Sequence, residues 1–158
     1  MTFTVKNSKA FRTDDGYAWS ATIYMDGVKL CYAFDHGRGG EVRIDWASKE
    51  AETKFGEHVA SLPADMNIPA ELLARYPEGM KRDAGDVIAR IVDNYENTKR
   101  EASTLKRWCK TKTIFRLKGD EVGTYRNVKN TFNPQVKLYL VGKYGDTIET
   151  IVNETLAA

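Results

Sequence analysis

Two stretches near the N-terminus alternate between apolar and polar residues. Residues 17–25 and residues 28–34 each place an apolar side chain at every second position, which is the period of a half-buried β-strand. Asp26-Gly27 joins them and suits a type I′ turn, which needs positive φ at both central positions. This turn predicts a register on one buried face, with the pairs Met25 and Val28, Ile23 and Leu30, Ala21 and Tyr32, and Trp19 and Phe34.

Two further stretches complete the predicted sheet. Val42, Ile44 and Trp46 alternate with polar residues after a glycine-rich segment, and residues 2–6 fit an earlier strand. The polar residues 7–15, which come next, predict a loop. We therefore expect an N-terminal antiparallel sheet with one buried face.

Helical spacing follows the sheet. Ser48 is a suitable N-cap for a helix that Pro63 ends, and a short helix is expected over residues 69–73. The longest helix is predicted over residues 83–109, with Asp83 as its N-cap. Its apolar stripe comprises Ile88, Ile91, Tyr95, Thr98, Ala102 and Leu105. We expect this stripe to cover the sheet, and a coiled-coil dimer seam is the alternative.

The C-terminal part of the chain mixes strands and a helix. Residues 113–117 and 124–129 predict two strands around a turn, and residues 147–153 predict a last strand. Asn133-Pro134 is typical of a helix start, because proline suits the first helical position.

Together these elements predict an α+β fold. An N-terminal antiparallel sheet is packed by helices, including one long helix, and a mixed β/α C-terminal part follows. At 158 residues the chain is expected to form a single α+β domain over residues 1–158.

Charge is distributed unevenly along the chain, although the formal net charge is only +2. Residues 1–80 carry 9 basic and 12 acidic side chains, whereas residues 81–158 carry 15 and 10. The second half of the chain is therefore the part that the sequence predicts to attract phosphate groups.

Other features predict an intracellular protein. Cys31 and Cys109 lie far apart at apolar positions, which favours free thiols over a disulfide or a metal pair. The first ten residues are polar, and the chain has no run of about 20 apolar residues. We therefore expect a cytoplasmic protein with no secretory signal and no membrane partner.

A glycine-rich segment between two predicted strands is a candidate site for a phosphate-bearing small molecule. It comprises His36, Gly37, Arg38, Gly39 and Gly40. Glycine permits unusual backbone torsions, and successive amides in such a segment can surround an anion. Arg38 adds a planar set of donors for phosphate, and His36 adds a donor or acceptor near neutral pH. The alternative is a flexible turn without a ligand, in which Arg38 is solvated or pairs with Asp35.

A basic region of the C-terminal half is a second candidate, for nucleic acid. It comprises Lys99, Arg100, Lys106, Arg107, Lys110, Lys112, Arg116 and Lys118. These residues surround Trp108, and basic side chains beside an aromatic ring are typical of nucleic-acid surfaces. The alternative is the solvated face of a long helix, with Trp108 in the core.

Catalytic and metal-binding patterns are sparse. His36, His58 and the two cysteines do not have the spacing of a zinc site, and no Gly-x-Ser-x-Gly elbow occurs. Asp35 and His36 as an acid–base pair for hydrolysis are the remaining enzymatic alternative. We expect no cofactor and no metal, and the sequence favours a role without catalysis.

Two long stretches resemble small uncharacterised bacteriophage proteins. "FRTDDGYAWSATIYMDGVKLCYAFDHGRGGEVRIDW" is similar to their opening, and "TKTIFRLKGDEVGTYRNVKNTFNPQVKLYLVGKYGDTIETIVNE" is similar to their C-terminal part. The resemblance implies a phage accessory protein in the host cytoplasm that binds and inhibits a host or anti-phage defence component. It carries over no catalytic residue. Nucleotide or nucleic-acid binding, through the glycine-rich segment or residues 99–118, is the alternative.

Overall fold

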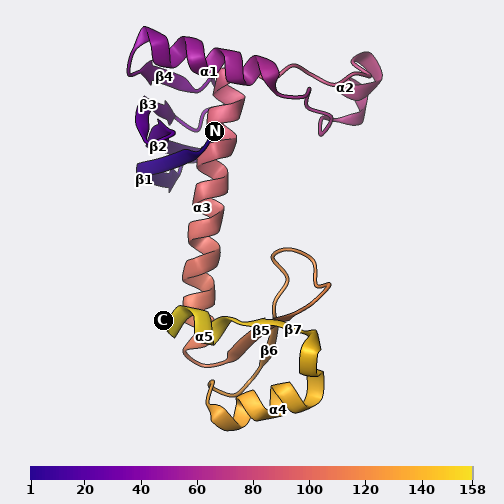
Figure 1. Cartoon of the computed structure of the whole chain (residues 1–158). Coiled ribbons are helices and arrows are strands. Elements are labelled where there is room, and N and C mark those ends of the chain that lie inside the picture. The colour runs from indigo at the N-terminus through magenta and orange to yellow at the C-terminus, as the bar shows by residue number, and fades with distance from the viewer. Residues whose placement is uncertain (158) are drawn as a thin grey trace. The chain divides into compact units, whose positions relative to one another are not determined.

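The computed structural model describes residues 1–157 and confirms the predicted α+β class (Figure 1). The chain divides into two compact units, Met1–Glu96 and Asn97–Ala158, which are called the first and the second unit below. One long helix, α3 (Ala84–Cys109), contributes to both units. The single domain over residues 1–158 stays a prediction.

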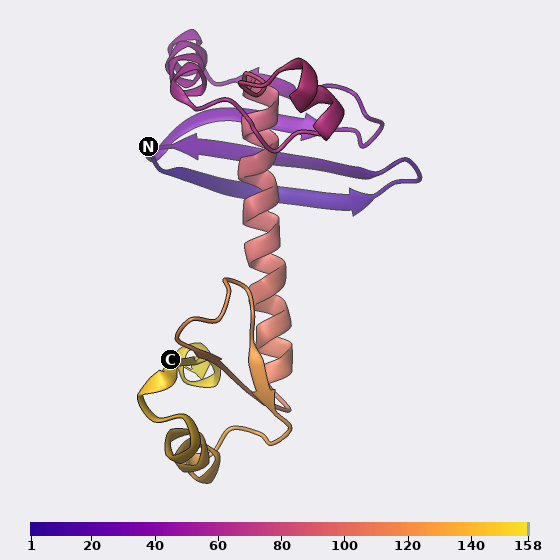
Figure 2. The ribbon, with the colours of Figure 1, turned by 90° about the vertical axis from the view of Figure 1, so that its right-hand side faces the viewer.

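The first unit contains a four-stranded antiparallel sheet whose strands follow one another in the order of the sequence (Figure 2). The strands are β1 (Phe3–Arg12), β2 (Tyr17–Met25), β3 (Val28–Asp35) and β4 (Arg43–Trp46). The predicted turn between β2 and β3 is confirmed, because φ is 50° at Asp26 and 83° at Gly27. Positive φ at both positions is the signature of a type I′ turn.

The predicted register of β2 and β3 holds only for the two pairs next to the turn, Met25 with Val28 and Tyr24 with Lys29. Met25 lies opposite Val28 as expected, but a bulge then places Ile23 opposite Cys31 instead of Leu30. The extra residue is Leu30, and Leu30 and Cys31 are both buried in the core. A bulge of this kind places two residues of one strand against one of its partner.

Because of the bulge, the side chains of β3 after Leu30 lie on the opposite faces from those predicted. Ala33 lies opposite Ala21, and both side chains are completely buried. Trp19 joins the same core, whereas Phe34 contacts the ring of Tyr32 on the opposite face. The prediction that Trp19 and Phe34 share one face is therefore wrong. Small side chains in the middle of this face leave room for the residues that the helices contribute.

Strand β1 extends further than predicted. Residues 7–12 belong to it, although their polarity predicts a loop. An irregularity between Lys6 and Lys9 includes Asn7, whose φ is 52°. The hydroxyl of Ser8 donates to the carboxylate of Glu96 at the irregularity. An edge strand tolerates such polar residues because its second face and free edge are in water.

Helices pack on one face of this sheet, and Figure 1 shows α3 passing along that side. Helix α1 (Lys49–Ser61) begins as predicted, since the Ser48 hydroxyl accepts from the amide of Ala51. Its residue Phe55 is completely buried, and the rings of Phe3 and Trp46 pack beside it. Helix α3 contributes further core residues, namely Val87, Ile88 and Val92.

The predicted stripe along α3 is only partly buried. Ile88 lies in the core of the first unit and Leu105 in a separate cluster of the second unit. Tyr95, Thr98 and Ala102 between them are exposed. The helix therefore covers the sheet with its first turns only.

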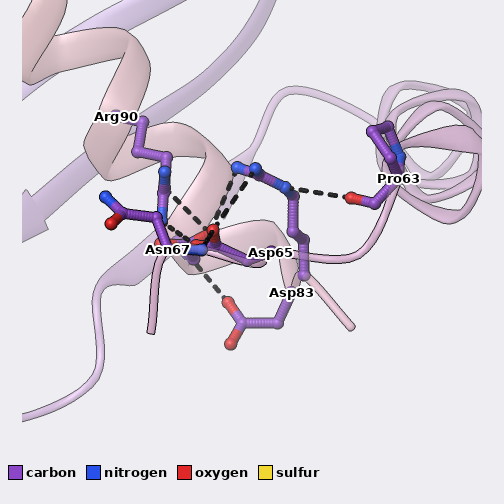
Figure 3. Close-up of polar contacts among 7 residues, drawn as sticks. Pro63, Asp65, Asn67, Asp83 and Arg90 are labelled. Atoms are coloured by element: carbon purple, nitrogen blue, oxygen red, sulfur yellow. Dashed lines mark hydrogen bonds and ion pairs between the residues drawn. The ribbon is translucent and has the colours of Figure 1, made fainter. Parts of the chain in front are cut away.

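A buried carboxylate anchors the segment between α1 and α3, which includes the short helix α2 (Ala70–Arg75). Figure 3 shows Arg90 of α3 reaching the carboxylate of Asp65, and the two form an ion pair. The backbone amide of Asn67 donates to the same carboxylate, and Arg82 lies 3.7 Å from it. Asp83 caps α3 as predicted by accepting from the amide of Asp86.

We expect the change Asp65→Asn to destabilise the first unit at neutral pH but much less in acid. The amide of Asn67, and then the charges of Arg90 and Arg82, hold the pKa of Asp65 below its ordinary 3.8. Such a group contributes stability above its unfolded pKa and loses it as the pH falls through its folded pKa. Urea unfolding of both proteins from neutral to strongly acid pH measures the difference, and a difference independent of pH would contradict the expectation.

The second unit contains a three-stranded sheet with β5 at its centre. The strands are β5 (Thr113–Leu117), β6 (Arg126–Val128) and β7 (Ile148–Ile151). Helix α4 (Pro134–Tyr144) is capped as predicted by Asn133, and a 3-10 turn, η1 (Gly145–Thr147), follows it. Val136 and Leu140 of α4 pack with Phe115 and Ile151 in one hydrophobic cluster.

The last predicted strand is shorter than expected. It ends at Ile151, and residues 152 and 153 instead begin helix α5 (Val152–Ala157). Asn153 is buried at this point, and its side chain hydrogen-bonds the backbone of Cys109, Lys112 and Ile114. These contacts hold the end of α3, the start of β5 and α5 together.

Candidate functional site

The glycine-rich segment is closed against the turn between β1 and β2. Gly37 is buried, and its amide donates to the carboxylate of Asp35 over 2.6 Å. Its carbonyl accepts from the hydroxyl of Thr13 at 3.3 Å. Its φ is +70°, and a Cβ at this position would lie 2.7 Å from the nitrogen of Ala18. Gly37 therefore packs the segment onto the sheet, and its amide is not available to a ligand.

A groove of about 940 Å³ lies beside this segment. His36, Arg38 and Gly40 line it, whereas Gly37 and Gly39 are not part of its lining. Arg43 adds a second guanidinium, but four carboxylates also line the groove, those of Asp14, Asp15, Asp35 and Glu41. This charge balance does not favour a phosphate group, and the predicted phosphate site stays a prediction.

The sheet face that points away from the core of the first unit, here called the outer face, carries a row of aromatic rings. The rings of Tyr32 and Phe34 lie 5.9 Å apart between centroids. The ring of His36 packs edge-on against Phe34 at 5.1 Å. Tyr24 lies on the same face of the neighbouring strand, because it alternates with the buried Ile23 and Met25.

Basic side chains flank these rings. Residues opposite one another in an antiparallel pair share a face, and this places four cations on the outer face, namely Lys6, Lys9, Lys29 and Arg43. The ammonium of Lys6 lies 4.7 Å from the ring centroid of Tyr24. Asp45, opposite Tyr32, is the one acidic residue at the paired outer-face positions of the four described strands. The face is therefore basic, although the first unit contains more acidic than basic residues.

Three of the four outer-face cations lie on the edge strands, whereas Lys29 lies on the central strand β3 together with Tyr32 and Phe34. Lys6 and Lys9 come from the edge strand β1, and Arg43 comes from the other edge strand, β4. Tyr24, Tyr32 and Phe34 come from the two central strands. The result is an aromatic centre between two basic margins.

Sequence reasoning missed this face because of the register error. The regular register assigns Tyr32 and Phe34 to the core and leaves Cys31 and Ala33 outside. The sequence did contain one signal for the correct face, namely the small size of Cys31 and Ala33. These residues lie opposite Ile23 and Ala21, and small side chains there fit closely beneath a helix. Phe11 and Arg43 of the outer face, and His36 beside Phe34, also line the groove.

The basic region of residues 99–118 is not gathered into one surface. Arg116 donates to Glu149 over 2.9 Å and to the carbonyl of Asp120 over 3.2 Å, so an internal carboxylate already holds it. This ion pair raises the pKa of Arg116. Lys118 lies beyond β5, about 20 Å of extended chain from Lys112.

The other predicted residues lie on α3 or directly after it. Lys99 and Arg100 each already take part in an interaction. Lys106, Arg107 and Lys110 are exposed around the end of the helix, and Lys112 is half-buried. Trp108 is 41 % exposed, so the alternative that places it in the core is wrong.

The remaining candidate residues, Asp35, His36 and His58, contact backbone groups or aromatic rings of the fold. Asp35 accepts from the amide of Gly37, and the ring of His36 lies against Phe34, so no acid–base pair of Asp35 and His36 is formed. The ring of His58 packs 5.5 Å from that of Phe3. Among residues 1–157, no group of three or more histidine, cysteine, aspartate or glutamate side chains is placed to hold a metal ion.

Both cysteines are free thiols, as predicted. Cys31 is completely buried, and burial raises its pKa to about 12. Burial also raises the pKa of Cys109, which is partly exposed. Neither thiol has the low pKa of a reactive cysteine.

Comparison with known proteins does not place the chain in a family. No family model, no curated protein and no solved structure matches it. In the part of the chain that the structure describes, no helix has both the length and the apolar character needed to cross a bilayer.

Proposed function

We propose that the protein binds single-stranded nucleic acid on the outer face of its N-terminal sheet. The observation that carries this proposal is the row of aromatic rings between basic margins. Nucleic-acid bases stack on aromatic rings, and this contact tolerates any sequence because every base has a π-face. Lysine and arginine beside the rings neutralise the phosphates and release counterions.

The composition of the outer face favours nucleic acid over a protein partner. Lysine is depleted in protein–protein interfaces, whose centres also contain few charged residues. Three of the four cations here are lysines, and Lys9, Lys29 and Arg43 form no ion pair within residues 1–157. A duplex fits poorly, because its bases are stacked on one another and cannot reach the rings of Tyr32 and Phe34.

We expect the change Phe34→Ala to weaken binding of a fluorescent oligothymidylate about tenfold, which corresponds to the loss of one stacked base. Fluorescence anisotropy titration of the full chain measures the affinity. Tyr76→Ala is the matched control, because Tyr76 is an exposed aromatic residue of the first unit outside the sheet. Equal affinities of the Phe34→Ala and Tyr76→Ala proteins would rule out the outer face.

The cations of the outer face are tested through the salt dependence. For the double change Lys9→Gln and Lys29→Gln, the slope of log K against log salt should fall by about 1.4, since each contact to a single strand contributes roughly 0.7. Lys54→Gln is the control, because Lys54 is exposed on α1 away from the sheet's outer face. A slope that the double change leaves intact would show that these lysines do not touch the phosphates.

The bacteriophage setting also stays a proposal. It rests on the resemblance of the sequence to phage accessory proteins, and inhibition of a host or defence component is part of the same expectation. Affinity capture from a phage-infected bacterial lysate, with and without nuclease treatment, tests it. A partner that survives nuclease treatment would support direct protein binding, whereas capture that depends on nucleic acid would support the outer face instead.

A further inference from the structure

We infer that the second unit has a nucleic-acid surface of its own, which binds the phosphate backbone of single strands and duplexes alike. This surface, here called the helix-end surface, consists of Lys106, Arg107 and Lys110. It belongs to a different unit from the outer face and rests on different observations. Its contact with nucleic acid therefore does not require the outer face to bind.

The first observation is a surplus of positive charge. Residues 97–158 contain 12 basic and 6 acidic side chains. Four of the six acids are already engaged inside this unit, namely Glu101, Asp120, Glu149 and Glu154. None of them pairs with Lys106, Arg107 or Lys110. The surplus is therefore not neutralised at the end of α3.

The second observation is the geometry of the helix end. Lys106 and Arg107 belong to the last turn of α3, and Lys110 directly follows the helix, so the three cations lie within five consecutive residues at its end. A depression of about 310 Å³ adjoins them, lined by Lys106 and Lys110 together with Thr131 and Phe132. No acidic residue lines this depression, in contrast to the groove beside the glycine-rich segment.

The helix dipole alone does not explain this arrangement. Basic residues are favoured near the negative C-terminal end of a helix. Here, however, the last carbonyls of α3 already have partners, because Asn153 donates to Cys109 and the amides of Thr111 and Lys112 donate to Trp108. The ammonium groups of Lys106 and Lys110 make no hydrogen bond within residues 1–157, and they are free to meet phosphate oxygens.

A phosphate-only surface differs from the outer face in what it recognises. The helix-end surface consists of cations, and cations contact the backbone of a duplex as well as that of a single strand. Its affinity is therefore expected to depend steeply on salt and only weakly on strandedness. The outer face, by contrast, needs bases that are free to stack.

The test uses the full chain with a short labelled duplex and a labelled oligothymidylate. We expect the double change K106Q and K110Q to weaken both complexes and to lower the salt slope for the duplex by about 1.8, since each contact contributes roughly 0.9. The matched control is the double change K118Q and K129Q, which removes the same charge from the same unit at exposed positions elsewhere. If the control variant weakens binding equally, the loss of net charge alone explains the effect, and the inference is overturned.

Different experimental results would reject each of the two proposed surfaces. Duplex binding that K106Q/K110Q abolishes, together with oligothymidylate binding that Phe34→Ala leaves unchanged, would support the helix-end surface and reject the outer face. A protein that binds oligothymidylate but no duplex would reject the helix-end surface alone. Binding to anionic phosphatidylserine vesicles that is stronger than duplex binding, and is lost in K106Q/K110Q, would overturn the assignment to nucleic acid.

Discussion

Replacement of Asn153 by leucine should lower the free energy of unfolding of the second unit by about 3–4 kcal/mol, because one buried and two partly buried backbone groups lose their partner. The side-chain oxygen of Asn153 accepts from the amide of Ile114 at 2.7 Å. Its nitrogen donates to the carbonyls of Lys112 and Cys109 at 2.9 and 3.1 Å. Leucine has a similar volume but can satisfy none of these groups, so the loss is one of hydrogen bonds and not of packing.

The effect should be confined to the second unit. Hydrogen exchange of the β5 amides should accelerate strongly in Asn153→Leu, with Ile114 the most affected, whereas the exchange of β2 amides should change little. Asn130→Ala is the control, since Asn130 is exposed and its side chain makes no hydrogen bond within residues 1–157. If the two variants unfold at the same urea concentration, Asn153 does not hold the unit together.

The second large effect concerns two glycines with nearly the same backbone conformation. Gly37 and Gly39 have φ values of +70° and +71°, so alanine is strained at both positions. A Cβ on Gly39 has nothing within 4 Å, whereas one on Gly37 would lie 2.7 Å from backbone atoms of Tyr17 and Ala18. We expect Gly39→Ala to destabilise the first unit by about 1 kcal/mol and Gly37→Ala by about 3 kcal/mol.

The difference between the two variants isolates the close approach of the backbones. Labelling of Cys31 by a thiol reagent reports the opening of the first unit, because this thiol is completely buried and its pKa is about 12. It should react fastest in Gly37→Ala. Equal rates in the two glycine variants would show that the segment can move away from the sheet without cost, and the closed turn described above would then be wrong.

Local signals in the sequence predicted most elements correctly. Asp26-Gly27 specifies its turn through the torsions that these two residues tolerate. Ser48, Asp83 and Asn133 cap their helices through hydrogen bonds to residues three positions later. Such signals depend only on neighbours in the chain, and they are therefore visible before any tertiary structure is known.

Two errors in the bounds of strands arose where distant contacts compete with the local pattern. The polarity of residues 7–12 predicts a loop, but hydrogen bonds to β2 keep them in the sheet. Residues 152 and 153 read as strand by their β-branched neighbours, yet the side chain of Asn153 is held by backbone groups about 40 residues away in the chain. Tertiary hydrogen bonds outweigh propensities of a few tenths of a kcal/mol per residue.

The sequence by itself determined the α+β class, the order of the elements and the positions of the turns and caps. Only the tertiary structure decided which face of β3 is buried, because the bulge at Leu30 depends on how Cys31 and Ala33 pack beneath the helices. That decision placed Tyr32 and Phe34 on the outer face. Pairings across the chain likewise decided which cations are neutralised, since Arg116 meets Glu149 and Arg90 meets Asp65 only after folding.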